Sequence, residues 1–222
     1  GRYYGGWWET IPSEFRRHIV IDGKATVEVD FSGLHPSILY AKEGLEMPTD
    51  PYAGILGERY RGISKKLFNA LINAKHDLQG PPRNVRIRYA DQPLSWVGIK
   101  QRIYELHKPI SHYFCTGVGL TLMHEDSELA TKVMLHFAKM GVPCLPVHDS
   151  FIIHHAYEDE LYEKMEELFL ERYKIPVKLK KESPLFYRDD LGMSEIFSVD
   201  EILHSLSMPQ EQRLITFRQM RD

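Results

Sequence analysis

Hydrophobic positions along the chain follow two periods, one typical of strands and one typical of helices. Residues 26–31 alternate β-branched and polar side chains, which predicts a strand. Between residues 59 and 75 the apolar residues recur at helical spacing, and polar residues that include Arg61 and Lys65 lie four apart on the opposite side. The pattern therefore predicts a strand and, further along, a helix with a cationic face.

The rest of the chain continues this mixture of strands and helices. Two short apolar runs flank His148 and Asp149, which predicts a tight β-hairpin over 144–155. Alternating lysines over 176–181 are typical of an edge strand. Amphipathic or helix-like segments predict further helices over 37–42, 95–107, 120–140 and 158–173. Hairpins mixed with helices indicate an α+β fold.

Composition places the chain among ordinary globular proteins. Its 222 residues are 43% hydrophobic and 27% charged, and no apolar run approaches the roughly 18 residues of a membrane span, so we expect no membrane partner. Two cysteines, Cys115 and Cys144, and the lack of a recognisable leader segment favour a cytoplasmic location. The chain opens without Met, and we expect it to be a fragment.

The overall charge argues against a protein that binds nucleic acid by bulk electrostatics. The formal net charge is −3, whereas such proteins are usually basic. Local cations exist, however, because Arg83, Arg86 and Arg88 follow a Gly-Pro-Pro break within one short segment. They fit a template channel or a solvated loop equally well.

Two aspartates stand beside predicted strands in apolar surroundings. Asp30 lies at the carboxyl end of the strand 26–31, and Asp149 lies at the tip of the hairpin. If the two carboxylates were neighbours, their repulsion would require a compensating charge, and a pair of divalent ions is the usual solution in phosphoryl chemistry. Either aspartate taken alone would more often cap a turn.

Five segments together resemble the polymerase family that includes DNA polymerase I, known as family A, and its relatives, the single-subunit phage-type RNA polymerases. Residues 29–35 (VDFSGLH) resemble motif A, and residues 145–151 (LPVHDSF) resemble motif C. Residues 61–65 (RGISK) are similar to the start of the fingers helix, motif B. The Gly1-Arg2 start, with the stretch to Arg17, and residues 122–127 match the positions of two further family segments.

The resemblance implies an architecture. We expect an α+β palm with an antiparallel sheet flanked by helices, joined to reduced helical fingers and lacking a thumb. The palm would comprise residues 1–50 and 111–185, and the fingers residues 51–110. Residues 186–222 would form a carboxyl-terminal tail, to which the resemblance assigns no role.

The resemblance also implies an activity, template-directed nucleotidyl transfer by a DNA polymerase of family A type. Asp30, Asp149 and the carbonyl of Phe31 would bind two Mg²⁺ ions, for which Mn²⁺ can substitute. Arg61 and Lys65 lie one helical turn apart, where they would bind the phosphates of a nucleoside triphosphate. The other partner would be a primer-template nucleic acid.

Further contacts follow from the same resemblance. His35 and Asn73 would lie at the nucleotide, and Arg2, His148 and Glu125 at the nucleic acid. His35 stands where family A DNA polymerases carry Glu, and Asn73 where they carry Tyr. Because those two residues monitor the sugar, RNA polymerase or primase-like activity stays possible.

Two other functions stay open at this stage. The dipeptides His76-Asp77 and His148-Asp149 suggest a metal-dependent His-Asp phosphohydrolase. The substitutions at His35, Asn73 and Glu125 suggest a degenerate palm that binds nucleic acid without catalysis. For an active polymerase without a thumb, processivity would come from a preceding amino-terminal portion or from an accessory subunit.

Overall fold

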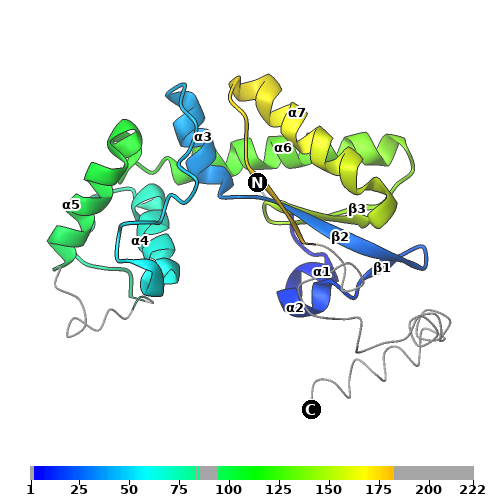
Figure 1. Cartoon of the computed structure of the whole chain (residues 1–222), viewed down its shortest axis with the longest axis horizontal. Coiled ribbons are helices and arrows are strands. Elements are labelled where there is room, and N and C mark those ends of the chain that lie inside the picture. The colour runs from blue at the N-terminus through cyan, green and yellow to red at the C-terminus, as the bar shows by residue number, and fades with distance from the viewer. Residues whose placement is uncertain (1–2, 84, 86–94, 183–222) are drawn as a thin grey trace, which may run out of the picture. The chain divides into compact units, whose positions relative to one another are not determined.

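The computed structural model describes residues 3–83, 85 and 95–182. The predicted tail 186–222 lies outside the described residues, and so do Arg2, Arg86 and Arg88. The fold is α+β, with an antiparallel sheet flanked by helices (Figure 1), as the sequence predicts.

A five-stranded antiparallel sheet forms the centre of the described chain. The order of four of its strands is β1-β2-β4-β3. The fifth strand, β5, pairs with the last four residues of β2, along the edge of β2 that does not contact β4. The central strand β2 therefore has neighbours on both sides at the end that carries Asp30. The strands are β1 (Val20–Ile21), β2 (Lys24–Phe31), β3 (Cys144–Val147), β4 (Ser150–His154) and β5 (Leu179–Glu182).

Alternation along β2 separates a core face from a polar face. Val27, Val29 and Phe31 are buried, with at most 1% exposed surface, whereas Glu28 and Asp30 point to the other side and keep partial access to solvent. The period of two thus directs the acidic residues of β2 away from the main core.

Helices cover both faces of the sheet (Figure 1). The long helices α6 (Gly119–Lys139) and α7 (Glu158–Tyr173) pack over the main core, where the rings of Phe31 and Phe169 lie 6.3 Å apart. The four-residue helices α1 (Trp7–Thr10) and α2 (Ser13–Arg16) lie on the other side. There a second, smaller core forms around Ile19, Val147 and Ile152, with Trp8, Ile11 and Leu145 packed against it.

A group of helices extends from the end of the sheet that carries Asp30. It consists of α3 (Leu34–Lys42), α4 (Arg61–Asn73) and α5 (Trp96–Leu106), with short 3₁₀ turns at Glu58–Tyr60 and Lys108–Tyr113. Aromatic rings hold it together, since Phe68 lies 4.4 Å from the His107 ring and 5.6 Å from the Phe114 ring. This core is continuous with that of the sheet.

The predicted elements are present, with shifted ends in places. The helix predicted over 37–42 begins earlier, at Leu34, because Gly33 adopts a left-handed φ of 72° ahead of it and Pro36 falls in the first turn, where no N–H is needed. The edge strand predicted over 176–181 begins later, at Leu179. The helix predicted over 158–173 has those limits, with three acidic residues in its first turn. The sequence patterns missed β1, α1 and α2.

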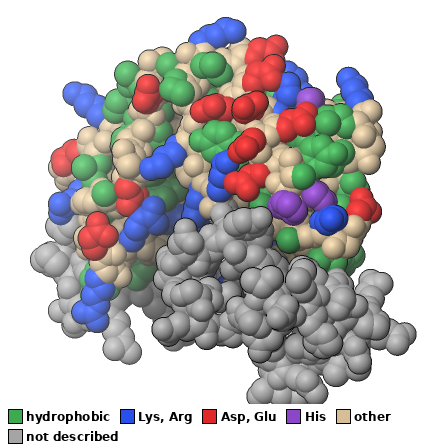
Figure 2. Space-filling view, turned by 45° about the vertical axis from the view of Figure 1, so that its right-hand side comes forward, with side chains coloured by type: hydrophobic (Ala, Val, Ile, Leu, Met, Phe, Trp, Pro, Cys, Tyr) green, Lys and Arg blue, Asp and Glu red, His purple; other side chains and the backbone are tan. Residues whose placement is uncertain are grey.

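Charged side chains of both signs are present on one face of the molecule. Figure 2 shows acidic and basic side chains intermixed on the face drawn, with histidines among them. That distribution agrees with the small net charge of −3. Across residues 3–83, 85 and 95–182, no helix is long and apolar enough to cross a membrane.

Candidate active site

Pairing of β2 with β4 brings Asp30 and Asp149 together from positions more than a hundred residues apart. Asp30 lies opposite Ser150 in the ladder, and the Phe31 N–H donates to the carbonyl oxygen of Asp149 at 3.2 Å. The end of β2 and the β3–β4 turn therefore meet at one edge of the sheet. His148 occupies that turn with a left-handed φ of 55°, and its side chain is exposed.

The Asp30 carboxyl lies in a strongly acidic environment. Burial is the largest effect that raises its pKa to about 7, followed by the negative charges of Asp149 and Glu28. Lys65 and Lys180 oppose the rise without cancelling it. Burial and two neighbouring carboxylates together disfavour the charged form of Asp30, and a bound cation would relieve both effects.

The Asp30 and Asp149 carboxylates are oxygen donors that this edge of the sheet could offer to a metal ion. Within the described part of the chain, no group of three or more His, Cys, Asp or Glu side chains could hold a metal. Mg²⁺ is usually held by one or two carboxylates together with substrate phosphates and water. Asp30 and Asp149 match that requirement. The side chain of Phe31 is buried in the core, so only its backbone could take part.

A cavity of about 320 Å³ opens beside Asp149, and Asp30 is not among the residues that line it. It gathers five of the residues predicted from the sequence, from three separate parts of the chain: His35, Lys65, Asn73, His148 and Asp149. Its remaining lining residues are Gly33, Leu34, Pro36, Tyr52, Asn69 and Met123. A volume of this size lies at the lower end of the range for small-molecule sites.

Tyr52 is a lining residue that sequence reasoning missed. It is 5% exposed, and its ring lies 5.2 Å from the Arg61 guanidinium and 5.9 Å from Lys65 Nζ. Burial raises its pKa to about 12, so the phenol keeps its proton at neutral pH. The Asp50-Pro51-Tyr52 turn carries no periodic pattern, and no signal in the sequence marks it.

Arg61 and Lys65 lie one turn apart on α4, but their surroundings differ. Lys65 lines the cavity, whereas Arg61 makes a two-pronged ion pair with Asp50, with Nε–Oδ2 at 2.7 Å and Nη2–Oδ1 at 3.1 Å. Asp50 also accepts a hydrogen bond from the Tyr52 N–H at 3.0 Å. Asp50 therefore holds Arg61 above the Tyr52 ring.

His35 and Asn73 both line the cavity. The His35 ring lies 3.7 Å from a carboxylate oxygen of Asp126, which is buried on α6 and was not predicted from the sequence. Asn73 donates to the Asn69 carbonyl at 2.8 Å. Gly119 leaves room for it, because a Cβ at position 119 would lie 2.2 Å from Asn73 Oδ1.

Glu125, which the resemblance assigns to the nucleic acid, does not line the cavity. The residue is 7% exposed, and its two carboxylate oxygens accept hydrogen bonds of 2.6 Å from Lys42 and from the Tyr173 hydroxyl. A carboxylate so buried and engaged is unavailable to a phosphate backbone. Its role is structural, because it joins α3, α6 and the end of α7.

The other predicted nucleic-acid contacts divide into two groups. Arg83 is exposed, and His148 lies between the cavity and a smaller hollow that Tyr3 and Asp126 also line. Arg2, Arg86 and Arg88 lie outside the described residues.

The dipeptides His76-Asp77 and His148-Asp149 do not have the geometry expected of a His-Asp phosphohydrolase site. Asp77 is half exposed and bonded to Lys100 Nζ at 2.8 and 2.9 Å, whereas Asp149 lies in a β-turn. A His-Asp phosphohydrolase would carry such a dipeptide on a helix. The described geometry therefore does not favour this alternative.

Comparisons with known proteins give structural likenesses and no sequence match. No protein-family model matches the chain, and no curated protein sequence matches it. A solved structure that is similar is the POL domain of Pol1 from M. smegmatis, in complex with DNA primer-template and dNTP. The identity is 12% and the TM-score 0.47, over 78% of this chain and 43% of that one. The chain thus spans less than half of that domain, and a likeness of this degree does not indicate which reaction it performs.

Proposed function

We propose that the chain is the catalytic palm, with reduced fingers, of a template-directed nucleotidyltransferase of the family A polymerase type. The observation that carries the proposal is the meeting of Asp30 and Asp149 at one edge of the sheet, beside a cavity lined by Lys65. Residues 1–50 and 111–185 would belong to the palm, and residues 51–110 to the fingers.

Two divalent ions would complete the site. Asp30, Asp149 and the backbone of Phe31 would hold Mg²⁺, or Mn²⁺ in its place, and the acidic surroundings that raise the Asp30 pKa support this assignment. When bound, such ions lower the pKa of an attacking hydroxyl and neutralise charge on a departing pyrophosphate.

The remaining cavity residues would bind and orient the substrates. Lys65 would contact the triphosphate, with Arg61 one turn away and Tyr52 packed against both cations. His35 and Asn73 would face the sugar and base of the incoming nucleotide. We propose DNA as the product, although His35 and Asn73 are not the residues that family A DNA polymerases use to exclude ribose.

The other macromolecular partner would be a primer-template duplex. His148 is exposed on the turn next to Asp149, a position that suits contact with the primer end. Because the formal net charge is −3, we expect weak and salt-sensitive binding of the duplex by this chain alone. A preceding portion of the protein or an accessory subunit would then supply processivity.

Template-directed primer extension tests the proposal. The wild-type chain, Asp30→Asn and Asp149→Asn are compared in Mg²⁺ and in Mn²⁺, with deoxy- and ribonucleoside triphosphates. Each of the two variants is expected to lose at least about a thousandfold in rate, since metal ions supply several kcal/mol of transition-state stabilisation. Undiminished nucleotide incorporation by both variants would contradict the proposed function.

A matched control is available in the β1–β2 turn. Asp22 has a left-handed φ of 52°, which Asn also tolerates, so Asp22→Asn removes one carboxylate and keeps the turn. We expect wild-type extension rates from this control. Primer-template binding by the wild-type chain without incorporation of any nucleotide would instead favour a degenerate palm.

A further inference from the structure

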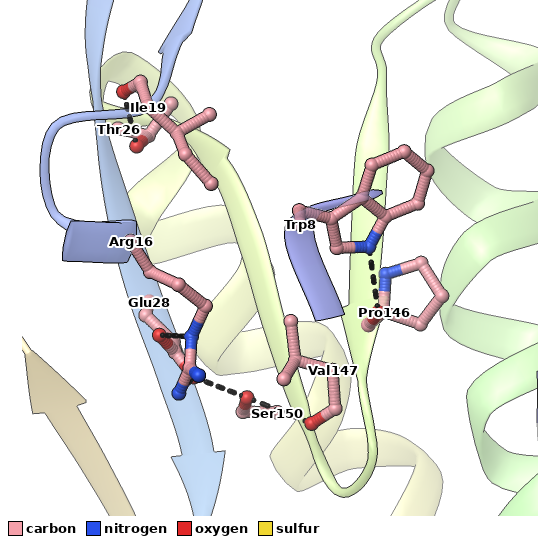
Figure 3. A network of polar contacts seen from close by, with 8 residues as sticks. All are labelled: Trp8, Arg16, Ile19, Thr26, Glu28, Pro146, Val147 and Ser150. Atoms are coloured by element: carbon pink, nitrogen blue, oxygen red, sulfur yellow. Dashed lines mark hydrogen bonds and ion pairs between the residues drawn. The ribbon is translucent and has the colours of Figure 1, made fainter. Parts of the chain in front are cut away.

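A polar network that includes Arg16, Glu28 and Ser150 lies on the face of the sheet opposite the main core (Figure 3). Glu28 is two residues from Asp30 on β2, and Ser150 directly follows Asp149. Arg16 on α2 forms a two-pronged pair with Glu28 on β2, with Nε–Oε2 at 2.9 Å and Nη2–Oε1 at 3.0 Å. The Ser150 hydroxyl on β4 donates to Glu28 Oε1 at 2.5 Å. The side chains of Arg16 and Glu28 are only 17% and 11% exposed, and Ser150 is 4% exposed.

Ser150 is the residue directly after Asp149, and its hydroxyl spans the turn. The same oxygen lies 3.0 Å from the Val147 carbonyl, so one side chain contacts both the near end of β3 and the neighbouring strand β2. Asp149 is therefore held in two ways. The hydrogen bonds of Ser150 fix the residue that follows Asp149 in the chain, and the Phe31 N–H donates to the backbone carbonyl oxygen of Asp149 at 3.2 Å.

We propose that Ser150 and Glu28 are positioning residues for Asp149, with Arg16 holding the Glu28 carboxylate in place. The proposal rests on the proposed function, because it assigns a role within the same site. It concerns three residues that the sequence motifs did not single out for such a role.

Charge explains why Arg16 belongs to the network. Glu28 is two residues from Asp30 on the same face of β2, and an unpaired carboxylate there would add to an acidic site. Arg16 balances that charge with fork geometry, which also fixes the orientation of the carboxylate. Glu28 can then accept the Ser150 hydrogen bond in one defined direction.

Packing alone does not account for these groups. Largely buried ion pairs contribute little net stability compared with apolar side chains of similar size. A directional role, in contrast, requires the charge and the hydroxyl, because catalytic groups must be held within about 0.5 Å of their working geometry.

Replacement of Ser150 tests the proposal. Ser150→Ala removes the hydroxyl, and Ser150→Thr keeps it on a β-branched residue that suits a strand. Thr26→Val is a matched control. Thr26 lies on β2, on the same face as Glu28 but toward the end of the strand away from Asp30. Its hydroxyl donates a buried 2.8 Å hydrogen bond to the Ile19 carbonyl (Figure 3).

The first readout needs neither metal nor activity. Hydrogen exchange of the Phe31 amide, followed by NMR, reports how firmly the Asp149 carbonyl is held. We expect exchange at least about tenfold faster in Ser150→Ala, wild-type exchange in Ser150→Thr, and no change at Phe31 in Thr26→Val. Unchanged exchange in Ser150→Ala, or equal acceleration in Thr26→Val, overturns the proposal.

Two further readouts separate positioning from a purely structural effect. In primer extension, Ser150→Ala should lower kcat about tenfold or more at unchanged KM for the triphosphate, and calorimetric Mn²⁺ binding should weaken in parallel. Ser150→Ala combined with Glu28→Gln should lose no more kcat than Ser150→Ala alone. If the wild-type chain extends no primer, the proposed function fails, while the exchange experiment still decides whether the network holds Asp149.

Discussion

The Tyr40 hydroxyl and Nδ1 of His107 lie 2.9 Å apart in the core where α3 meets the helical group of α4 and α5. His107 is 2% exposed and surrounded by aromatic rings. Burial lowers the pKa of His107, with the Pro51 backbone opposing the shift. The imidazole is therefore neutral in the folded protein at pH values where an exposed histidine takes up a proton.

Acid should destabilise the chain through His107. At pH values below about 6.5, the ordinary pKa of histidine, His107 is protonated in the unfolded state but stays neutral in the folded state. The free energy of unfolding therefore falls by up to about 1.4 kcal/mol per pH unit, until the pH reaches the lowered pKa of folded His107. Urea denaturation at pH 7.5 and 5.5 measures this loss. His107→Gln keeps a partner for Tyr40 and should lose less stability over that interval; an equal loss would contradict the assignment.

Asp30→Asn should stabilise the metal-free protein. The folded pKa of Asp30, raised to about 7, exceeds its unfolded value, so its charge costs stability as pH rises from about 4 through 7. At pH 8 the variant should unfold with a free energy higher by on the order of 4 kcal/mol, since the pKa rises by about three units and each unit corresponds to about 1.4 kcal/mol.

Thermal unfolding with and without Mg²⁺ provides the control for Asp30→Asn. Mg²⁺ should raise the Tm of the wild-type chain and leave that of Asp30→Asn nearly unchanged, because the ion binds the folded state through this carboxylate. A lower Tm for the metal-free variant at pH 8 would show that Asp30 has a structural role instead.

Local patterns predicted most of the regular elements, because those elements follow amphipathic periods. Helix 158–173 presents Leu161, Met165 and Phe169 to the core at helical spacing, and β2 alternates strictly. The four-residue helices α1 and α2 are too short for any period. They are held by contacts with distant segments: the small core around Ile19, the Trp8 hydrogen bond to Pro146 and the pairing of Arg16 with Glu28.

Contacts between distant segments limited the prediction of the site. The resemblance to polymerase motifs singled out Asp30 and Asp149, and the strand pairing that joins them is consistent with it. Glu125 was assigned to nucleic acid because its position matched a family segment, but its partners come from α3 and the end of α7. Neither partner can be identified from spacing along α6.

Tyr173→Phe should lower stability without affecting nucleic-acid binding. The change leaves one oxygen of buried Glu125 without a donor, at a cost of about 1–3 kcal/mol. Tyr113→Phe is the control, because its hydrogen bond to Glu43 is exposed and its loss should cost under about 0.5 kcal/mol. Chemical denaturation measures both, and fluorescence anisotropy with a labelled primer-template should give wild-type affinity. A matching loss of affinity would restore the predicted contact of Glu125 with nucleic acid.

Asp50→Asn should strengthen triphosphate binding. Asp50 occupies Nε and Nη2 of Arg61, the donors that a phosphate would use, so substrate and Asp50 compete for the same cation. Asn removes the charge yet can still accept the hydrogen bond from the Tyr52 N–H, which preserves the turn. The Arg61 side chain is 50% exposed, so the change should be modest, with KM for the triphosphate about two- to fivefold lower and kcat unchanged.

Salt dependence distinguishes this competition from a rearranged turn. An exposed ion pair is screened as ionic strength rises, so the KM difference between Asp50→Asn and the wild-type chain should shrink between 50 mM and 500 mM salt. Asp50→Ala loses both the charge and the hydrogen bond to Tyr52, and it should lower kcat as well because the Tyr52 ring loosens beneath Lys65. A higher KM in Asp50→Asn would mean that Asp50 orients Arg61 for the phosphate, and the competition between the two would have to be abandoned.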